Sequence, residues 1–367
     1  MFRLLRRWLN KKRVGNGPPQ HAITPLSRIF VKGRSRFLAA RFKDPRAASL
    51  FGHDLRRGLA YRLYLPTGSA RRDSLPLVVM LHGCRQNPLS FANGTRMNAL
   101  AEEFRCAVLY PEQNKQSNPL CCWNWFRSSE LTGHGEAALL AGLIGQVTER
   151  RPIDRHRVYV VGMSAGGAMA CLLDIRYSRL FAACAIHSGV VYAAASSAMQ
   201  ALGVMGSGPS PSSMEHAWQL VREASESAIV VPTLVIHGDS DATVNPVNAD
   251  RIIEQLRARA ALIEPAAGGL SNSDERRIDS EDRVYRQRDY TLQGRLVFRQ
   301  ILIEGLGHAW SGGDARYEFN DASRPDASRL ILDYLMQFQQ KDVPIAAGTT
   351  EEAEPASAGA PRLRART

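Results

Sequence analysis

The sequence predicts an α/β fold in which a mostly parallel central sheet carries helices on both faces. Two observations support this prediction. Short apolar runs typical of buried strands alternate with segments of helical spacing, and the polar residues that suit catalysis follow directly after strands, where ligands bind in such sheets. The predicted strands are 59–65, 75–82, 106–110, 158–161, 182–186, 229–237 and 296–304, and the predicted helices are 97–104, 135–151, 246–261 and 326–339.

The elements are predicted from local patterns. Residues 59–65 alternate between apolar and polar and stop at Pro66, as a strand near a sheet edge does. Residues 75–82, read LPLVVMLH, form a continuous apolar run and therefore a buried strand. The segment 135–151 presents one apolar face, and Pro152 lies just past its end, which predicts a helix.

Two segments interrupt the alternation. Residues 193–213 are rich in Ala, Ser, Gly and Met, and we expect a cap or a mobile loop there. Residues 271–289 mix arginines with acidic residues around short polar runs, which favours an exposed excursion.

Charge divides the 367-residue chain into a basic arm (1–46), a main domain (47–341) and a tail (342–367). The arm holds thirteen Lys or Arg and one acid, whereas the remaining chain has 34 residues of each sign. We expect the arm to be partly disordered or amphipathic, and an amphipathic arm would rest on an anionic or hydrophobic surface, such as that of a membrane or a granule. No recognition motif accompanies its charge, so no nucleic-acid partner is expected. The tail is rich in Ala, Pro, Glu and Thr and is predicted to be disordered.

No segment matches a membrane span or a secretory signal. No apolar run approaches the roughly 18 to 20 residues of a transmembrane helix. Arg6 and Arg7 interrupt the only apolar core near the start of the chain. The expected location is therefore cytoplasmic or granule-associated.

The segment 157–171, read RVYVVGMSAGGAMAC, contains a G-x-S-x-G pattern at residues 162–166. A β-branched run precedes the pattern and a helical segment follows it, which is the strand–turn–helix context of a nucleophile elbow. We therefore predict that Ser164 is a catalytic nucleophile, exposed above the sheet at a helix N-terminus.

An acid and a histidine follow two later strands. Asp239 and Asp241 come after the strand 229–237, and His308 comes after the strand 296–304. The order Ser, Asp, His is that of the α/β-hydrolase fold. We predict that His308 is the general base and that Asp241, preferred over Asp239 because the loop needs a few residues to reach across, orients it.

Three further histidines, His82, His187 and His237, also follow strands, each beside Gly or Ser. We expect structural hydrogen bonding from them rather than catalysis.

The predicted oxyanion donors are the backbone N–H groups of Ala165 and Cys84, the latter in the loop after the strand 75–82.

The cysteines leave one disulfide pairing open. Cys84 and the adjacent pair Cys121 and Cys122 lie in loops that should face the site, so Cys84 could pair with either of them. Reduced thiols are the default without a secretory signal. No cysteines show C-x-x-C spacing, so no metal is expected. The proposed chemistry needs no cofactor.

Several motifs together resemble one family. The segments LHGCRQNP (81–88), CWNWF (122–126), RVYVVGMSAGGAMA (157–170), HGDSDATV (237–244) and GLGHAWSGG (305–313) are similar to esterases of the polyhydroxybutyrate (PHB) depolymerase family, which are related to the feruloyl and acetylxylan esterases of carbohydrate esterase family 1. The resemblance runs from about residue 59 to residue 338. It implies the α/β-hydrolase fold, the triad Ser164, Asp241 and His308, and an oxyanion loop at Cys84. It does not extend to a secretory signal or to a substrate-binding module of the kind that extracellular polymer depolymerases carry.

Aromatic residues gather in two loops predicted to lie near the chemistry. We predict that Trp123, Trp125, Trp310 and Gln86 contact the substrate. The expected activity is hydrolysis of carboxylic esters, namely a PHB-type polyester, its oligomers or similar short hydroxyacyl esters. The alternatives are a feruloyl or acetylxylan esterase on plant cell-wall esters and a non-catalytic granule-associated protein on a hydrolase scaffold.

Overall fold

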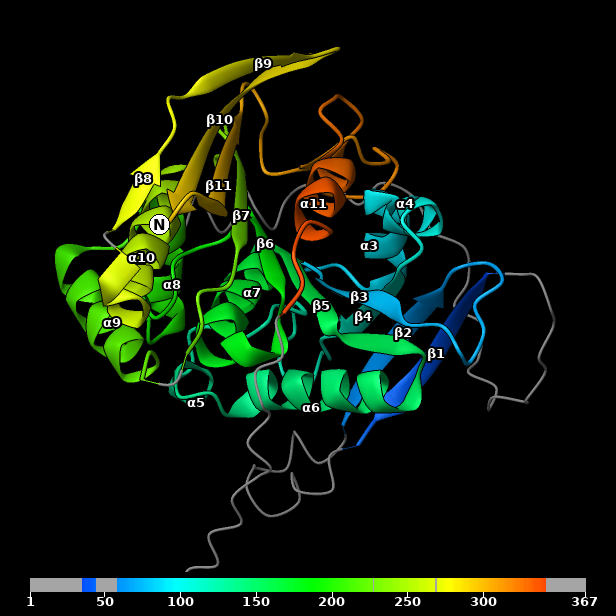
Figure 1. Ribbon diagram of the computed structural model, residues 1–367. Helices are drawn as coiled ribbons and strands as arrows, with labels where there is room; N and C mark the ends of the chain where they lie inside the picture. The colour runs from blue at the N-terminus through cyan, green and yellow to red at the C-terminus, as the bar shows by residue number, and fades with distance from the viewer. Residues whose placement is uncertain (1–34, 44–57, 227, 268, 341–367) are drawn as a thin grey trace, which may run out of the picture.

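A sheet of eleven strands runs through the residues that the computed structural model describes, which are 35–43, 58–226, 228–267 and 269–340 (Figure 1). The strand order is β1-β2-β4-β3-β5-β6-β7-β11-β10-β8, with β9 paired to β10. The strands are β1 (Arg36–Phe42), β2 (Leu59–Leu65), β3 (Leu75–Leu81), β4 (Ala107–Glu112), β5 (Ile153–Met163), β6 (Ala183–His187), β7 (Thr233–Gly238), β8 (Leu270–Asn272), β9 (Arg276–Ser280), β10 (Arg283–Leu292) and β11 (Arg295–Ile303).

The middle of the sheet is parallel. Strands β4, β3, β5, β6, β7 and β11 pair in parallel, whereas β1, β2, β8, β9 and β10 join at the two ends in antiparallel fashion. Parallel strands buried on both faces read as continuous apolar runs, which is why the sequence revealed them. The predicted fold class is confirmed.

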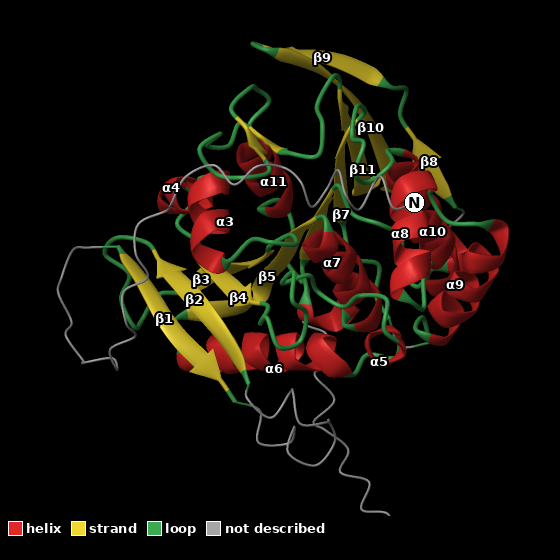
Figure 2. Ribbon diagram, turned by 180° about the vertical axis from the view of Figure 1, so that it is seen from behind, coloured by secondary structure: helices red, strands yellow, loops and turns green. Residues whose placement is uncertain are grey.

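Helices cover both faces of the sheet because side chains on a strand alternate in direction (Figure 2). On β3, Leu77 and Val79 pack into one core, whereas Val78 and Met80 pack into the other. The first core contains residues of α6 (Gly135–Arg150), α7 (Ala165–Arg176) and α10 (Val247–Ile263), and the second contains residues of α3 (Pro88–Thr95), α4 (Met97–Glu103) and α11 (Ala327–Leu335). A short helix, α5 (Ser128–Leu131), precedes α6.

Part of the predicted basic arm belongs to the sheet. Strand β1 pairs with β2 over its whole length, from Arg36 opposite Leu65 to Phe42 opposite Leu59. Phe37 packs edge-on against Tyr64 and Tyr110. The predicted domain boundary at residue 46 is therefore corrected, since charge alone did not show that the apolar positions of this segment complete a sheet edge. The amphipathic segment 1–13 and the tail 342–367 lie outside the described residues.

The segment 271–289 also joins the sheet, instead of forming an excursion. Strand β10 pairs with β11, and β8 and β9 pair with β10. Opposite charges meet across these strands, as where Arg299 Nε donates to Asp289 Oδ1 at 2.6 Å. Cross-strand ion pairs allow a charged sequence to form an exposed sheet.

The segment 193–213 forms helices rather than a mobile loop. Helix α8 (Ala198–Ser207) begins after Ser197, whose side chain caps it, and α9 (Pro211–Glu223) begins after Ser210 in the same way. The C-terminal carbonyls of α8 are held by the chain after β7, because Asn245 N donates to Met205 O at 2.7 Å and Asn248 Nδ2 donates to Val204 O at 3.0 Å. The part of the chain that the structure describes contains no helix long and apolar enough to cross a membrane.

Candidate active site

The turn between β5 and α7 holds Ser164 in a backbone conformation that few residues adopt, with φ 58° and ψ −121°. Close approach of neighbouring backbone explains its two glycines. A Cβ atom on Gly162 would lie 2.0 Å from Gly166 O, and one on Gly166 would lie 2.0 Å from Leu81 O. Only glycine fits at either position. The turn places Ser164 immediately before the first residue of α7, where backbone N–H groups are free to meet negative charge.

The Asp241 carboxylate lies at the centre of a hydrogen-bond network. Its Oδ1 accepts from Thr243 N and Val244 N, both at 2.8 Å. Its Oδ2 lies 2.7 Å from His308 Nδ1 and 3.4 Å from His237 Nε2, which also donates to Val244 O at 2.9 Å. Burial alone would raise the pKa of Asp241, but the hydrogen bonds and charges of His237 and His308 lower it well below its usual range.

The ionised state of Asp241 fixes the tautomer of His308. An ionised carboxylate only accepts hydrogen bonds, so His308 Nδ1 carries the proton that lies between the two groups. In the neutral ring Nε2 therefore keeps its lone pair. A histidine in this state can accept a proton from a nearby hydroxyl.

The neighbouring acid, Asp239, has a different environment. Its Oδ1 accepts from Gly305 N at 2.8 Å and from Ser240 Oγ at 3.0 Å. Its Oδ2 lies 3.7 Å from Arg286. These contacts hold the ends of β7 and β11 together at the surface.

His187 lies between Ser164 and the loop that carries His308. Its carbonyl accepts from Ser164 N at 2.9 Å, and its ring stacks on Trp310 at 4.9 Å between centroids. Burial, with added repulsion from His237 and His308, lowers the pKa of His187 to about 3. The three further histidines are all fully buried, and His82 Nδ1 is bonded to Gly83 O at 2.8 Å.

The loop after β3 approaches Ser164 and carries Cys84. A Cβ on Gly83 would lie 3.4 Å from Ser164 Cβ, and Gly83 N donates to Gln86 Oε1 at 2.8 Å. Among the hydrogen bonds of the described residues, none uses the N–H groups of Cys84 or Ala165. Two free donors beside a nucleophile are the arrangement that an oxyanion requires.

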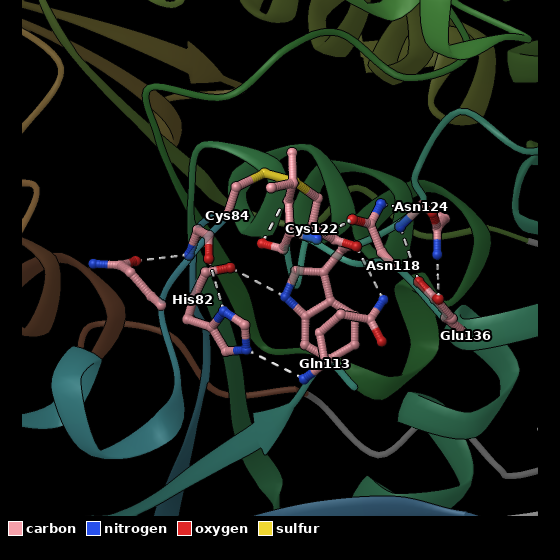
Figure 3. The surroundings of a disulfide bond; sticks show 11 residues. His82, Cys84, Gln113, Asn118, Cys122, Asn124 and Glu136 are labelled. Carbon is pink, nitrogen blue, oxygen red and sulfur yellow. Dashed lines mark hydrogen bonds between the residues drawn. A yellow bond between two sulfur atoms is a disulfide. The ribbon is translucent and has the colours of Figure 1, made fainter. Parts of the chain in front are cut away.

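A disulfide joins Cys84 to Cys122 and leaves Cys121 as a free thiol, which settles the pairing that the sequence left open (Figure 3). Hydrogen bonds reinforce this link. Trp123 Nε1 donates to His82 O at 3.1 Å, and Gln113 N donates to His82 Nε2 at 3.2 Å. The loop 121–126 is thereby fixed against the loop that carries Cys84.

A buried carboxylate pair holds the far side of the loop 121–126. Glu136 accepts from Asn124 N at 2.9 Å and from Asn124 Nδ2 at 2.6 Å (Figure 3). Glu130 accepts from Glu136 N and Ala137 N, at the start of α6. Burial, followed by the charge of Glu136, raises the pKa of Glu130 to about 8.

The predicted substrate contacts need correction. Trp123 and Trp310 are 0% exposed, and Trp310 Nε1 donates to Ser328 Oγ at 3.0 Å inside the second core. Neither ring has surface to offer a substrate. Trp125 and Gln86 are each only 5% exposed, and Gln86 is engaged by Gly83 and by the carbonyl of Glu318. Sequence proximity to the chemistry did not distinguish a packing ring from a substrate-facing one.

Some residues near the site had no signal in the sequence. Gln113, Asn124 and Glu136 brace the loop 121–126, and Phe319 meets the His308 ring at 6.1 Å between centroids. Asn124 lies in the segment CWNWF (122–126), where the aromatic residues gave the signal, and the other three residues come from segments without a motif. Only the fold brings them to the site.

Known esterases resemble this chain over much of its length. The family model described as esterase PHB depolymerase matches residues 59–280. Poly(3-hydroxyalkanoate) depolymerase C of Paucimonas lemoignei is 33% identical over 254 residues, which cover 67% of this chain and 57% of that protein. Acetylxylan esterase A of Emericella nidulans is 29% identical over 52% of this chain and 64% of its own length. The chain thus spans less than two thirds of each of these relatives.

A solved structure, acetyl xylan esterase from Aspergillus awamori, superposes with a TM-score of 0.56 at 19% identity, covering 74% of this chain and 94% of that one. This likeness shows the α/β-hydrolase fold. With the family match extending over residues 59–280, the chain belongs to the esterase PHB depolymerase family.

Proposed function

We propose that this protein is a serine carboxylesterase that works through an acyl-enzyme on Ser164, with His308 as the base and Asp241 as the group that orients it. The observation that carries the proposal is the 2.7 Å contact between His308 Nδ1 and Asp241, which accompanies a serine held at φ 58° in the turn after β5. A purely structural serine gains nothing from such backbone strain, which is concentrated at functional sites.

The first half of the reaction forms the acyl-enzyme. His308 Nε2 accepts the Ser164 Oγ proton as Oγ attacks the ester carbonyl carbon. The Cys84 and Ala165 N–H groups bind the oxyanion of the tetrahedral intermediate, each contributing about 3 kcal/mol. Collapse of the intermediate breaks the bond to the alcohol oxygen, which takes the proton from His308. Asp241 stabilises the transient imidazolium without becoming protonated.

The second half restores the enzyme. Water attacks the acyl-enzyme while His308 Nε2 accepts a water proton, and the same oxyanion donors act again. Ser164 leaves with the proton from His308. The acid product then dissociates.

The proposed substrates are short hydroxyacyl esters and oligomers of a PHB-type polyester. Support comes from the depolymerase relative, which matches a longer stretch of this chain than does the acetylxylan esterase of Emericella nidulans. The second candidate is an acetylxylan or feruloyl esterase: the name of that relative supports the acetylxylan class, and a similar protein named feruloyl esterase B of Neurospora crassa supports the feruloyl class. An anionic surface, or the surface of a granule or membrane, is the proposed partner of the part of the basic arm that precedes β1, on the charge of residues 1–34 alone, which hold nine Lys or Arg and no acid.

The experiment pairs Ser164→Ala with a substrate panel. The wild type should hydrolyse p-nitrophenyl acetate and be labelled by an organophosphonate, and Ser164→Ala should lose both while unfolding at the same temperature. Labelling that persists in Ser164→Ala contradicts the assignment. Rates on hydroxybutyrate oligomers, acetylated xylan and methyl ferulate then decide between the two substrate classes. A wild type inactive on every ester supports the non-catalytic alternative.

A further inference from the structure

Hydrogen bonds from Arg85 and Gln86 to Glu318 connect the loop that carries Cys84 to the segment after His308. Arg85, directly after Cys84, donates from its guanidinium to Glu318 Oε1 at 2.6 Å. Gln86 Nε2 donates to Glu318 O at 3.3 Å. These two hydrogen bonds hold the loop that carries Cys84 and the segment after His308 at a fixed separation.

Phe319 occupies the space between these loops. Its ring meets the His308 ring edge-on, at 6.1 Å and an interplanar angle of 77°. On another side, the Arg85 guanidinium carbon lies 5.8 Å from the ring centroid. Phe319 is partly exposed, unlike Trp123 and Trp310. It is therefore an aromatic ring beside the proposed base that retains surface for a ligand.

The backbone supports a functional interpretation of Phe319. Its φ of 62° lies in the left-handed region, where a bulky side chain is an outlier. A backbone hydrogen bond holds it there, because Trp310 N donates to Phe319 O at 2.8 Å. Strain of this kind persists where the surroundings enforce it, often at ligand sites.

Proton transfer determines which half of the ester Phe319 would meet. The base returns its proton to the leaving alcohol oxygen, so that oxygen must come within hydrogen-bonding distance of His308 Nε2. A ring packed against His308 and facing the oxyanion loop therefore borders the alcohol half of the ester rather than its acyl half.

We propose that Phe319, backed by Arg85, forms the wall of the alcohol subsite and selects open-chain alcohol groups over cyclic ones. This inference rests on the proposed esterase function. The Arg85–Glu318 pair fixes the wall because it spans the two loops, so the subsite does not widen for a cyclic alcohol. An open-chain alcohol, such as the secondary alcohol of the next unit of a PHB-type polyester with its single methyl branch, passes along the ring.

The test compares two ester series in Phe319→Ala. In the first series the acyl group is butyryl and the alcohol is methanol, n-butanol or cyclohexanol. Removing the wall should raise the ratio of kcat/KM for the cyclohexyl ester to that for the methyl ester by about tenfold or more, since a few carbon atoms in an apolar pocket change rates by that factor. In the second series the alcohol is methanol and the acyl group lengthens from acetyl to hexanoyl, and its ratios should not change.

The chain supplies a matched control. Phe104, next to α4, has the Arg329 guanidinium carbon 5.6 Å from its ring centroid, and Arg329 pairs with Glu103 at 2.5 Å. Phe104, Arg329 and Glu103 thus repeat the arrangement of Phe319, Arg85 and Glu318 in a part of the structure away from Ser164. Phe104→Ala should leave both ester series unchanged. Phe319→Gly is a second variant that removes the ring without straining the backbone, because glycine adopts a φ of 62° readily.

The outcomes separate the two proposals. If Phe319→Gly leaves the alcohol ratio unchanged, or shifts the acyl ratio equally, the subsite assignment is wrong. If the wild type hydrolyses no ester in either series, the esterase proposal itself fails. A selective rise in the alcohol ratio in both Phe319 variants, absent in Phe104→Ala, supports the inference.

Discussion

The two acids after β7 offer a direct comparison of a proposed triad carboxylate with a nearly adjacent structural one. In Asp241→Asn the amide oxygen can still accept from Thr243 N and Val244 N, both at 2.8 Å. The amide NH₂ then occupies the position of Oδ2, which lies 2.7 Å from His308 Nδ1. Two donors cannot share that contact, so the ring must place its proton on Nε2.

A proton on Nε2 prevents His308 from acting as a base. The same change of tautomer at a serine triad lowers kcat about 10⁴-fold, equivalent to about 5.4 kcal/mol in the activation barrier. We expect a loss of this size in Asp241→Asn.

Asp239→Asn is the matched control. Its amide oxygen can keep the 2.8 Å bond from Gly305 N. The loss is the 3.7 Å interaction with Arg286, which is partly exposed and therefore contributes about 0.2–1 kcal/mol. Activity should fall at most about fivefold.

The assay is kcat and kcat/KM on p-nitrophenyl butyrate, with thermal unfolding of each variant as the check on folding. Equal losses in the two variants would refute the reasoning, and so would an Asp241→Asn protein that retains more than a tenth of the activity. A larger loss in Asp239→Asn would transfer the orienting role to that residue.

Two further predictions concern the supports of the site. Cys122→Ser removes the disulfide to Cys84, which spans a sequence separation of 38 residues and contributes about 4 kcal/mol to stability in the chain-entropy description. Both the melting temperature and kcat should therefore fall in Cys122→Ser, whereas Cys121→Ser should change neither. A fall in Cys121→Ser alone would contradict the assigned pairing. The pKa of Glu130 is about 8 in the folded protein and 4.5 in the unfolded chain, so the unfolded chain ionises at lower pH. The stability that the protonated carboxyl contributes to the fold is therefore lost as pH rises from 4.5 to 8, by at most about 1.4 kcal/mol per pH unit. Between pH 5 and pH 8 the wild type should therefore lose more melting temperature than Glu130→Gln, and parallel curves for the two proteins would rule this out.

The sequence by itself determined the central sheet and the order of the proposed catalytic residues. Buried parallel strands such as 75–81 and 158–163 need apolar residues at every position, so they are visible without a partner. The elbow at Ser164 needs glycine at 162 and 166 because backbone atoms approach within 2.0 Å of where a Cβ would stand. Local requirements of this kind leave a local pattern in the sequence.

Only the tertiary structure decided the features that depend on contacts between distant segments. Cys121 and Cys122 are equivalent in sequence, and the direction of the loop selects Cys122. Trp310 follows His308 by two residues, yet its ring turns into the core against His187, whereas Phe319 returns to the His308 ring. The physical reason is that burial and ring contacts depend on where the chain comes back in space, and a pattern of neighbouring residues does not encode that return.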